Sequence, residues 1–413
     1  MPRETSASRL PRPVWLLGWI SLATDAATEA VYPLLPFFLT TVLHASAASL
    51  GVVEGVAEAV NSVLKVMAGR VADRSPNKRP LLLLGYSVSS FARPFIAVAT
   101  TWTQVLSVRV LDRVGKGVRS APRDAMLAGW ATPDTRGKVF GVHQGMDHIG
   151  AIVGPTLAFL FLLAYPDRYR TLFSLTIVPG AIAVILILFV REPPRGEVDP
   201  MASAQATGVD VQANPAAPSR LPRDFTRFMC VLALFTLGNS TDAFLLLRLT
   251  SAAGTVHYVP LMWAALHVVK ASVSMVAGGW SDRIGRRTII ASGWLVYAVV
   301  YGGFALSATL PALLGWFLLY GCYFGFAEGT EKALVADLAP TSMRGLAFGI
   351  YNAVTGLGAL AASITFGLVW NAFGPTAAFG LGSSLALAAT LLLTIIRPTG
   401  RPSPGAGVLE ALI

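Results

Sequence analysis

The feature that most constrains this chain is a series of about a dozen apolar stretches, each near the roughly 20 residues that a membrane-spanning helix needs. Within hydrocarbon, backbone polar groups must be satisfied inside the element, so stretches of this length are predicted to be helices. Transmembrane β-strands would be about half as long and would alternate polar with apolar residues. The predicted spans are residues 14–42, 47–70, 80–100, 103–128, 137–164, 170–191, 225–249, 257–280, 288–308, 311–336, 345–370 and 375–396.

The composition supports a lipid environment. Hydrophobic residues make up 54% of the 413 residues and charged residues only 13%, and the mean hydropathy is +0.61. The chain is therefore predicted to be an all-α integral membrane protein with the lipid bilayer as its solvent. The first 15 residues are polar and basic, and the apolar stretch after them has no small-residue cleavage site, so we interpret it as a retained signal anchor.

The formal net charge of +10 follows the predicted topology. In a soluble protein such a charge would favour nucleic-acid binding, but here the basic residues concentrate at the termini and in every second connection. The positive-inside rule therefore predicts a multi-pass protein of the plasma (inner) membrane with both termini and the central connection in the cytoplasm. Nucleic acid is not an expected partner. The main basic positions are Arg3, Arg9, Arg12, Arg70, Arg74, Lys78, Arg79, Arg136, Lys138, Arg191, Arg195, Arg220, Arg223, Arg227, Arg283, Arg286, Arg287, Arg344, Arg397 and Arg401.

The chain divides into two halves that repeat one another. Residues 192–224 are rich in Pro, Ala, Ser, Gln and Gly and have no apolar period, which predicts a cytoplasmic linker. It separates a six-helix bundle at residues 1–191 from another at residues 225–413. Asp282 follows Asp73 by 209 residues in matching motifs, and the RGLAFG segment at 344–349 follows RGKVFG at 136–141 by 208. A shared offset indicates internal duplication, a common architecture of secondary transporters.

These motifs carry a family resemblance. GRVADRSPNKR at 69–79 and GGWSDRIGRR at 278–287 resemble the cytoplasmic loop signature of the major facilitator superfamily, and Arg109 with Arg136 resembles its fourth-helix arginine pattern. The resemblance implies the major facilitator fold. It also implies that the loop residues latch one bundle to the other as the transporter alternates. The gating residues would be Gly69, Asp73, Arg74, Gly278, Asp282 and Arg283.

A second motif is partial. Gly141, Gly150, Gly154 and Pro155 follow the spacing of the fifth-helix antiporter motif of that superfamily. The glycine pair that normally closes the motif is absent, because residues 156–159 read TLAF. The resemblance implies export.

Ionisable residues inside the predicted spans are candidates for function, because each costs roughly 2.5–3.5 kcal/mol at mid-membrane on insertion scales. Asp25 and Glu29 are four residues apart in the first span, and Glu54, Glu58, Asn61 and Lys65 form one polar stripe in the second. Such a stripe must line an aqueous cavity or pair with another helix. We expect the proton-coupling residues to be Asp25, Glu29, Glu54 and Glu58.

The fourth span presents the complementary basic face, and the second half holds fewer charges. A basic face suits an anionic or zwitterionic substrate, whereas the acids of the first span resemble those of drug and metabolite exporters of the superfamily. We expect the amino-terminal charges to form most of the site, closed by the seventh, eighth and tenth spans. The predicted substrate-binding residues are Arg93, Arg109, Arg113, Asp147, Asn239, Asp242, Glu328 and Glu331.

The motifs of other function classes are absent from the sequence. It has no phosphate-binding GxxxxGK[ST] loop, nucleophile elbow or HExxH motif, so we expect neither an ATP-driven pump nor an enzyme, and no cofactor or metal. The prediction is a monomeric secondary transporter that moves a small organic or chelate-type solute by alternating access, coupled to protons and in the direction of export. Two alternatives stay open: a proton-driven importer of an anionic solute, and a ligand sensor or assembly protein that transports nothing.

Overall fold

The computed structural model describes residues 10–75, 77–131, 135–193, 221–340 and 343–395, and these residues form helices and short connections without a strand. A few side chains near helix ends are also not described. The elements are α1 (Arg12–Val31), η1 (Tyr32–Leu34), α2 (Leu35–Phe37), η2 (Phe38–Val42), α3 (Ala47–Arg74), α4 (Arg79–Ala92), η3 (Arg93–Val98), α5 (Trp102–Gly129), α6 (Arg136–Ala164), α7 (Tyr169–Leu175), α8 (Ile177–Ile187), α10 (Arg223–Gly238), α11 (Ala243–Ala253), α12 (Val259–Ile284), α13 (Arg286–Leu306), α14 (Leu310–Leu338) and α15 (Arg344–Ile395).

Eight helical segments of the described chain are long and apolar enough to cross a membrane. α1, α5 and α12 are not among the eight, and each has ionisable side chains within its length, such as Glu29 in α1 and Lys270 in α12. α15 has 52 residues, which at about 1.5 Å per residue would measure about 78 Å, more than twice the roughly 30 Å hydrocarbon thickness. It is two helices that meet at Gly374, whose φ of 81° is not helical. With α15 counted as two helices and with α1, α5 and α12 added to the eight segments, the helices correspond to the predicted set of about twelve spans.

Proline explains the irregular end of the first span. Pro33 and Pro36 lack the backbone N–H that an α-helix needs, and the chain there passes through a 3-10 turn, a short α-turn and a five-residue π-helical turn before α3. α5 begins regularly, because Thr101 and Gln104 form a reciprocal capping box. α5 packs against α3 in the parallel direction.

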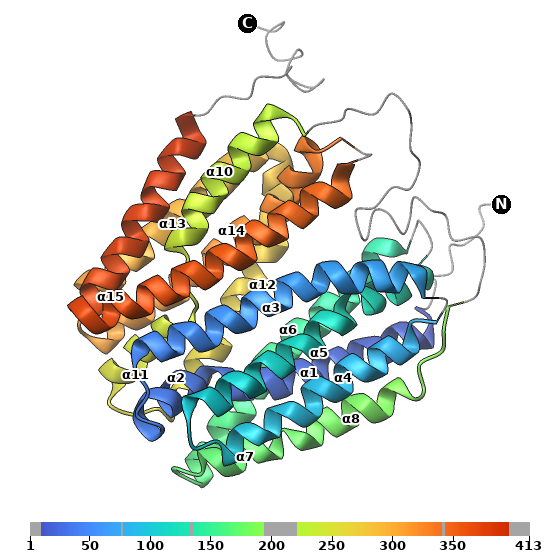
Figure 1. Cartoon of the computed structure of the whole chain (residues 1–413), viewed down its shortest axis with the longest axis horizontal. Coiled ribbons are helices and arrows are strands. Elements are labelled where there is room, and N and C mark those ends of the chain that lie inside the picture. The colour runs from blue at the N-terminus through green and yellow to red at the C-terminus, as the bar shows by residue number, and fades with distance from the viewer. Residues whose placement is uncertain (1–9, 76, 132–134, 194–220, 341–342, 396–413) are drawn as a thin grey trace, which may run out of the picture.

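The helices of each half gather together, blue to green on one side and yellow to red on the other (Figure 1). Between the halves, α3 packs along α15 and α6 packs along α12. In the sequence repeat, α12 is the counterpart of α3, and the first part of α15 is the counterpart of α6. The two interfaces are therefore equivalent, as expected for a duplicated unit, and the fold is two six-helix bundles.

One contact marks the axis that relates the halves. The hydroxyls of Tyr32 and Thr241 lie 3.2 Å apart, and the two residues are separated by 209 positions. Asp73 and Asp282 have the same separation in the sequence, so Tyr32 and Thr241 are counterparts. A residue that contacts its own counterpart lies at the symmetry axis. The axis therefore passes between the end of α1 and the start of α11.

The linker predicted at 192–224 lies mostly outside the described residues, so these domain boundaries stay a prediction. On the outer faces, large apolar side chains such as Leu157, Leu160 and Leu163 of α6 are more than half exposed. A surface of this kind suits hydrocarbon rather than water.

Candidate functional site

A cavity of about 450 Å³ lies between the two halves. It joins a second compartment of about 590 Å³, and both are lined by Glu29, Lys116, His267, Lys270, Phe324 and Glu328. The first compartment contains six carboxylates and three lysine or arginine side chains among its lining residues. Glu54 and Glu58 of the α3 stripe and Arg113 and Lys116 of the α5 face line this cavity. Its carboxylates are Glu29, Glu54, Glu58, Asp242, Glu328 and Glu331, and its cations are Arg113, Lys116 and Lys270.

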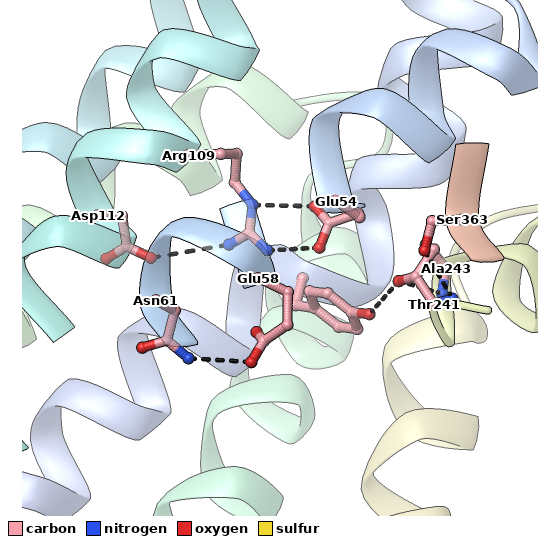
Figure 2. Close-up of polar contacts among 9 residues, drawn as sticks. Glu54, Glu58, Asn61, Arg109, Asp112, Thr241, Ala243 and Ser363 are labelled. Carbon is pink, nitrogen blue, oxygen red and sulfur yellow. Dashed lines mark hydrogen bonds and ion pairs between the residues drawn. The ribbon is translucent and has the colours of Figure 1, made fainter. Parts of the chain in front are cut away.

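Arg109 is at the centre of a buried charge network in the first half. Its Nε and Nη2 donate to the two carboxylate oxygens of Glu54 at 3.0 and 2.7 Å. On its other side, Nη1 lies 3.7 Å from Asp112, which accepts a bond of 2.9 Å from Arg93. Figure 2 shows Arg109 between Glu54 and Asp112. All four side chains are at most 5% exposed, so this network is shielded from solvent.

Arg93 and Arg109 are not among the residues that line either compartment. Arg109 and Glu54 form a bidentate pair, in which Nε and Nη2 of the guanidinium bond to the two carboxylate oxygens. This is the strongest geometry for such a pair. Of the four predicted proton carriers, Glu54 alone is held by a charged partner within the described structure.

Glu58, Arg113 and Lys116 occupy the cavity side of the same wall. Glu58 accepts a bond of 3.0 Å from Asn61 of its own helix (Figure 2). Among the described residues, neither Arg113 nor Lys116 has a carboxylate oxygen within 4.0 Å. Arg113 Nε is buried and has no hydrogen-bond partner there. These two cations are thus available to a solute.

Glu29 connects the halves. It accepts a bond of 2.8 Å from Trp263 Nε1 of α12, and His267 Nε2 of the same helix lies 3.8 Å away. Beside it, the ring of Tyr32 lies 5.1 Å from that of Trp263. Glu29 therefore belongs to both the cavity and the interface between the bundles.

The second-half wall is acidic and aromatic. Tyr320 donates a hydrogen bond of 2.6 Å to Asp242. Glu331 accepts one from Trp294 at 2.8 Å and one from Tyr351 at 3.1 Å. Both carboxylates are held by neutral donors.

Asn239 belongs to the same wall, where it donates to the hydroxyl of Tyr323 at 2.9 Å. Sequence reasoning did not single out the aromatic residues of this wall. A signal was present, because Tyr297 and Tyr301 are four residues apart and Tyr320 and Tyr323 three apart, so each pair shares a helix face.

Glu328 lies at the open side of the cavity. Lys270 and Lys332 are 3.6 and 3.5 Å from its carboxylate, and its side chain is 52% exposed. The negative charge of Glu328 is thus already compensated by two lysine side chains of the protein.

Asp25 and Asp147 line the second compartment. Asp147 lies 3.6 Å from His143, whereas Asp25 has no hydrogen bond or ion pair within the described residues. Gly150 and Gly154 let α6 approach α1 closely here, since a Cβ at Gly154 would collide with the carbonyl oxygen of Ala26. The partial antiporter motif therefore sets the helix contact beside Asp25.

The predicted gating residues cannot be placed in the same detail. At Gly69, Asp73, Arg74, Gly278 and Asp282 only the helical backbone is described, and Arg283 is exposed at the end of α12. Their role as a latch stays a prediction. Among the described residues, no group of three His, Cys, Asp or Glu side chains is placed to hold a metal ion.

Comparison with known proteins agrees with this architecture. The sequence profile of the Major Facilitator Superfamily matches residues 15–268 and residues 228–410. An uncharacterized MFS-type transporter of Methanocaldococcus jannaschii is 32% identical over 393 residues, covering 94% of this chain and 95% of that protein. The multidrug resistance protein MdtL of Escherichia coli is 24% identical over 375 residues, covering 87% and 89%.

A solved structure shares the fold. The crystal structure of the nucleoside transporter NupG superposes with a TM-score of 0.71 at 14% identity and covers 93% of this chain and 98% of that one. The matched profile spans nearly the whole sequence, and the fold and the cavity between duplicated bundles agree with it. The chain therefore belongs to the Major Facilitator Superfamily of membrane transporters.

Proposed function

We propose that the protein is a proton-coupled secondary transporter that exports a small organic or chelate-type solute by alternating access. The observation that carries the proposal is the kind of hydrogen-bond donor that contacts the carboxylates of the cavity. Glu29, Glu58, Asp242 and Glu331 come from both halves, and each accepts a hydrogen bond from a neutral donor. Such a carboxylate can take up a proton without breaking a salt bridge, which suits it to exchange protons for a solute.

We assign the proton-carrying role to Asp25, Glu29 and Glu58. Glu54, the fourth candidate, is better suited to position Arg109, because their bidentate pair is nearly fully buried. Arg93 and Arg109 then act on the solute through the shape and charge of the wall rather than by contact. Arg113, Asn239, Asp242, Glu328 and Glu331 are proposed to line the solute site, with Asp147 in the second compartment.

Two observations support export. Gly150 and Gly154 of the partial antiporter motif pack against the helix that carries Asp25, and a distant relative is named a multidrug resistance protein. Import of an anionic solute is the alternative, favoured by Arg113 and Lys116, which have no carboxylate oxygen within 4.0 Å among the described residues. A sensor without transport is a further alternative, but it has no need of a charged cavity with two compartments.

We also propose that both termini are cytoplasmic in an inner membrane and that a monomer is the working unit. The basic connections alternate with poorly charged ones along the chain, and both walls of the cavity come from one polypeptide. Cysteine labelling from each side of intact cells tests the orientation, and a reactive outer cysteine in the connection between α3 and α4 would contradict it.

The function is tested in proteoliposomes loaded with a pH dye and challenged with organic anions, metal chelates and lipophilic cations. One solute class should move protons, and a Glu29→Gln, Glu58→Gln double variant should not. Asp337→Asn is the matched control, because Asp337 pairs with Arg286 outside the cavity. The sign of the pH change separates exchange from symport. If the double variant moved protons as the wild type does, the coupling assignment would be wrong.

A further inference from the structure

Some charged side chains that reach the cavity from one half have no charged counterpart in the other, although the halves descend from one duplicated unit. Arg113 and Lys116 of α5 reach the cavity from the first half. At an offset of 208 or 209 residues, their counterparts in the second half are uncharged. Asp242 reaches it from the second half, and its counterparts at the same offsets are uncharged too. The helices around the cavity are thus related by the duplication, whereas these three charged side chains are not.

Neither side chain has an oppositely charged group within 4.0 Å among the described residues. Arg113 is 8% exposed, and its buried Nε lacks a hydrogen-bond partner. Asp242 accepts its hydrogen bond from the neutral hydroxyl of Tyr320. Burying a charge without a close partner is unfavourable, so Arg113 and Asp242 each favour a solute group of opposite sign.

The surface between these charges is aromatic. Trp263, Tyr320 and Tyr323 line the same compartment, and the rings of Tyr320 and Tyr323 lie 5.6 Å apart in a stacked arrangement. Aromatic faces attract ammonium groups and pack against flat apolar bodies. This surface therefore favours a solute with an aromatic body near its amine.

We infer that the solute is an aromatic zwitterion. Its acidic group binds Arg113 and Lys116, its amine binds Asp242, and its body packs on Tyr320 and Tyr323. The inference rests on the proposed transport function and adds the substrate class. An organic anion would leave Asp242 without a close cationic partner, and an organic cation would leave Arg113 without a close anionic one. Glu58 shares the basic wall, where the proposed function assigns it a proton.

Calorimetric titration of the purified full-length protein in detergent tests this with three probes built on one indole ring. Tryptophan carries both charges, tryptamine carries only the amine, and indole-3-propionate carries only the acid. We expect tryptophan to bind about tenfold more tightly than either of the others. Equal or tighter binding of tryptamine or of indole-3-propionate, or no tryptophan binding at about 10 mM, overturns the inference.

Two variants test the polarity of the site and serve as folding controls for each other. Asp242→Asn should weaken tryptophan and tryptamine about tenfold and leave indole-3-propionate unchanged. Arg113→Gln should weaken tryptophan and indole-3-propionate and leave tryptamine unchanged. Loss of all three probes in both variants contradicts the assignment of opposite groups to opposite walls.

Proton movement in vesicles is a separate readout. Tryptophan binding without proton movement would refute the coupling and retain the substrate class. Proton movement driven only by tryptamine would retain the coupling and refute the zwitterion.

Discussion

The pair of Glu54 and Arg109 makes a quantitative prediction about stability. Both side chains are at most 5% exposed, and two charge-assisted hydrogen bonds join them. Removing one partner of a buried pair costs about 3–5 kcal/mol, because the remaining charge loses its counterion. Glu54→Leu should lower the free energy of unfolding by about 3 kcal/mol, the lower end of this range, because Asp112 stays 3.7 Å from Arg109. Arg109→Met should lower the free energy of unfolding by about 5 kcal/mol, because Glu54 then has no cation bonded to it.

The double variant decides the interpretation. Replacing both partners by apolar residues removes the uncompensated charge together with the pair, so it should be destabilised by less than either single variant. Asp112 keeps its 2.9 Å bond from Arg93 in every case. The free energy of unfolding is measured by titrating SDS into dodecyl maltoside micelles while following far-UV circular dichroism.

The half-exposed pair of Arg286 and Asp337 is the control, and Asp337→Asn should change stability by less than about 1 kcal/mol. An interaction free energy below about 1 kcal/mol in the double-mutant cycle would refute the reasoning, because the buried pair would then behave like a surface pair.

Three further predictions concern other parts of the site. Gly154→Leu should lower the melting temperature and abolish transport because its side chain has no room against α1, whereas Gly141→Ala, with nothing within 4 Å, should do neither; equal melting temperatures would argue against the close contact. Trp294→Phe removes a hydrogen bond to buried Glu331 and should cost about 1–3 kcal/mol in SDS titration, and an unchanged stability would mean that Glu331 finds another donor. Glu29→Gln should retain solute binding in calorimetry but lose solute-driven proton movement, and persistence of that movement would remove Glu29 from the coupling group.

Helical periodicity identified the polar faces of α3 and α5 but not how they pair. Glu54 and Glu58 lie on one stripe and are equivalent by spacing, yet Glu54 bonds to Arg109 while Glu58 bonds to Asn61. Asp112 lies beside the basic face in sequence, and the structure places it between Arg93 and Arg109. Pairing depends on the rotation of one helix against another, which a single helix pattern does not contain.

The second-half wall shows a different limit. Its carboxylates were identified because a charge inside an apolar span is conspicuous. Its tyrosines were not, because an aromatic residue at helical spacing is ordinary in a membrane helix. Only the fold brings Tyr320 to Asp242 and Tyr351 to Glu331.

The duplication links these observations. The halves share their helices, their interfaces and the contact of Tyr32 with Thr241 at the axis, so the rocking of one bundle against the other can be nearly symmetric. The charges have diverged, since the first half concentrates cations on α5 and the second half bonds Asp242 and Glu331 to neutral donors. Motion therefore depends on what the two halves share, whereas selectivity and coupling depend on how they differ. Substitutions at Arg113 or Asp242 should accordingly change which solute is moved, and substitutions at Gly154 should change whether any solute is moved.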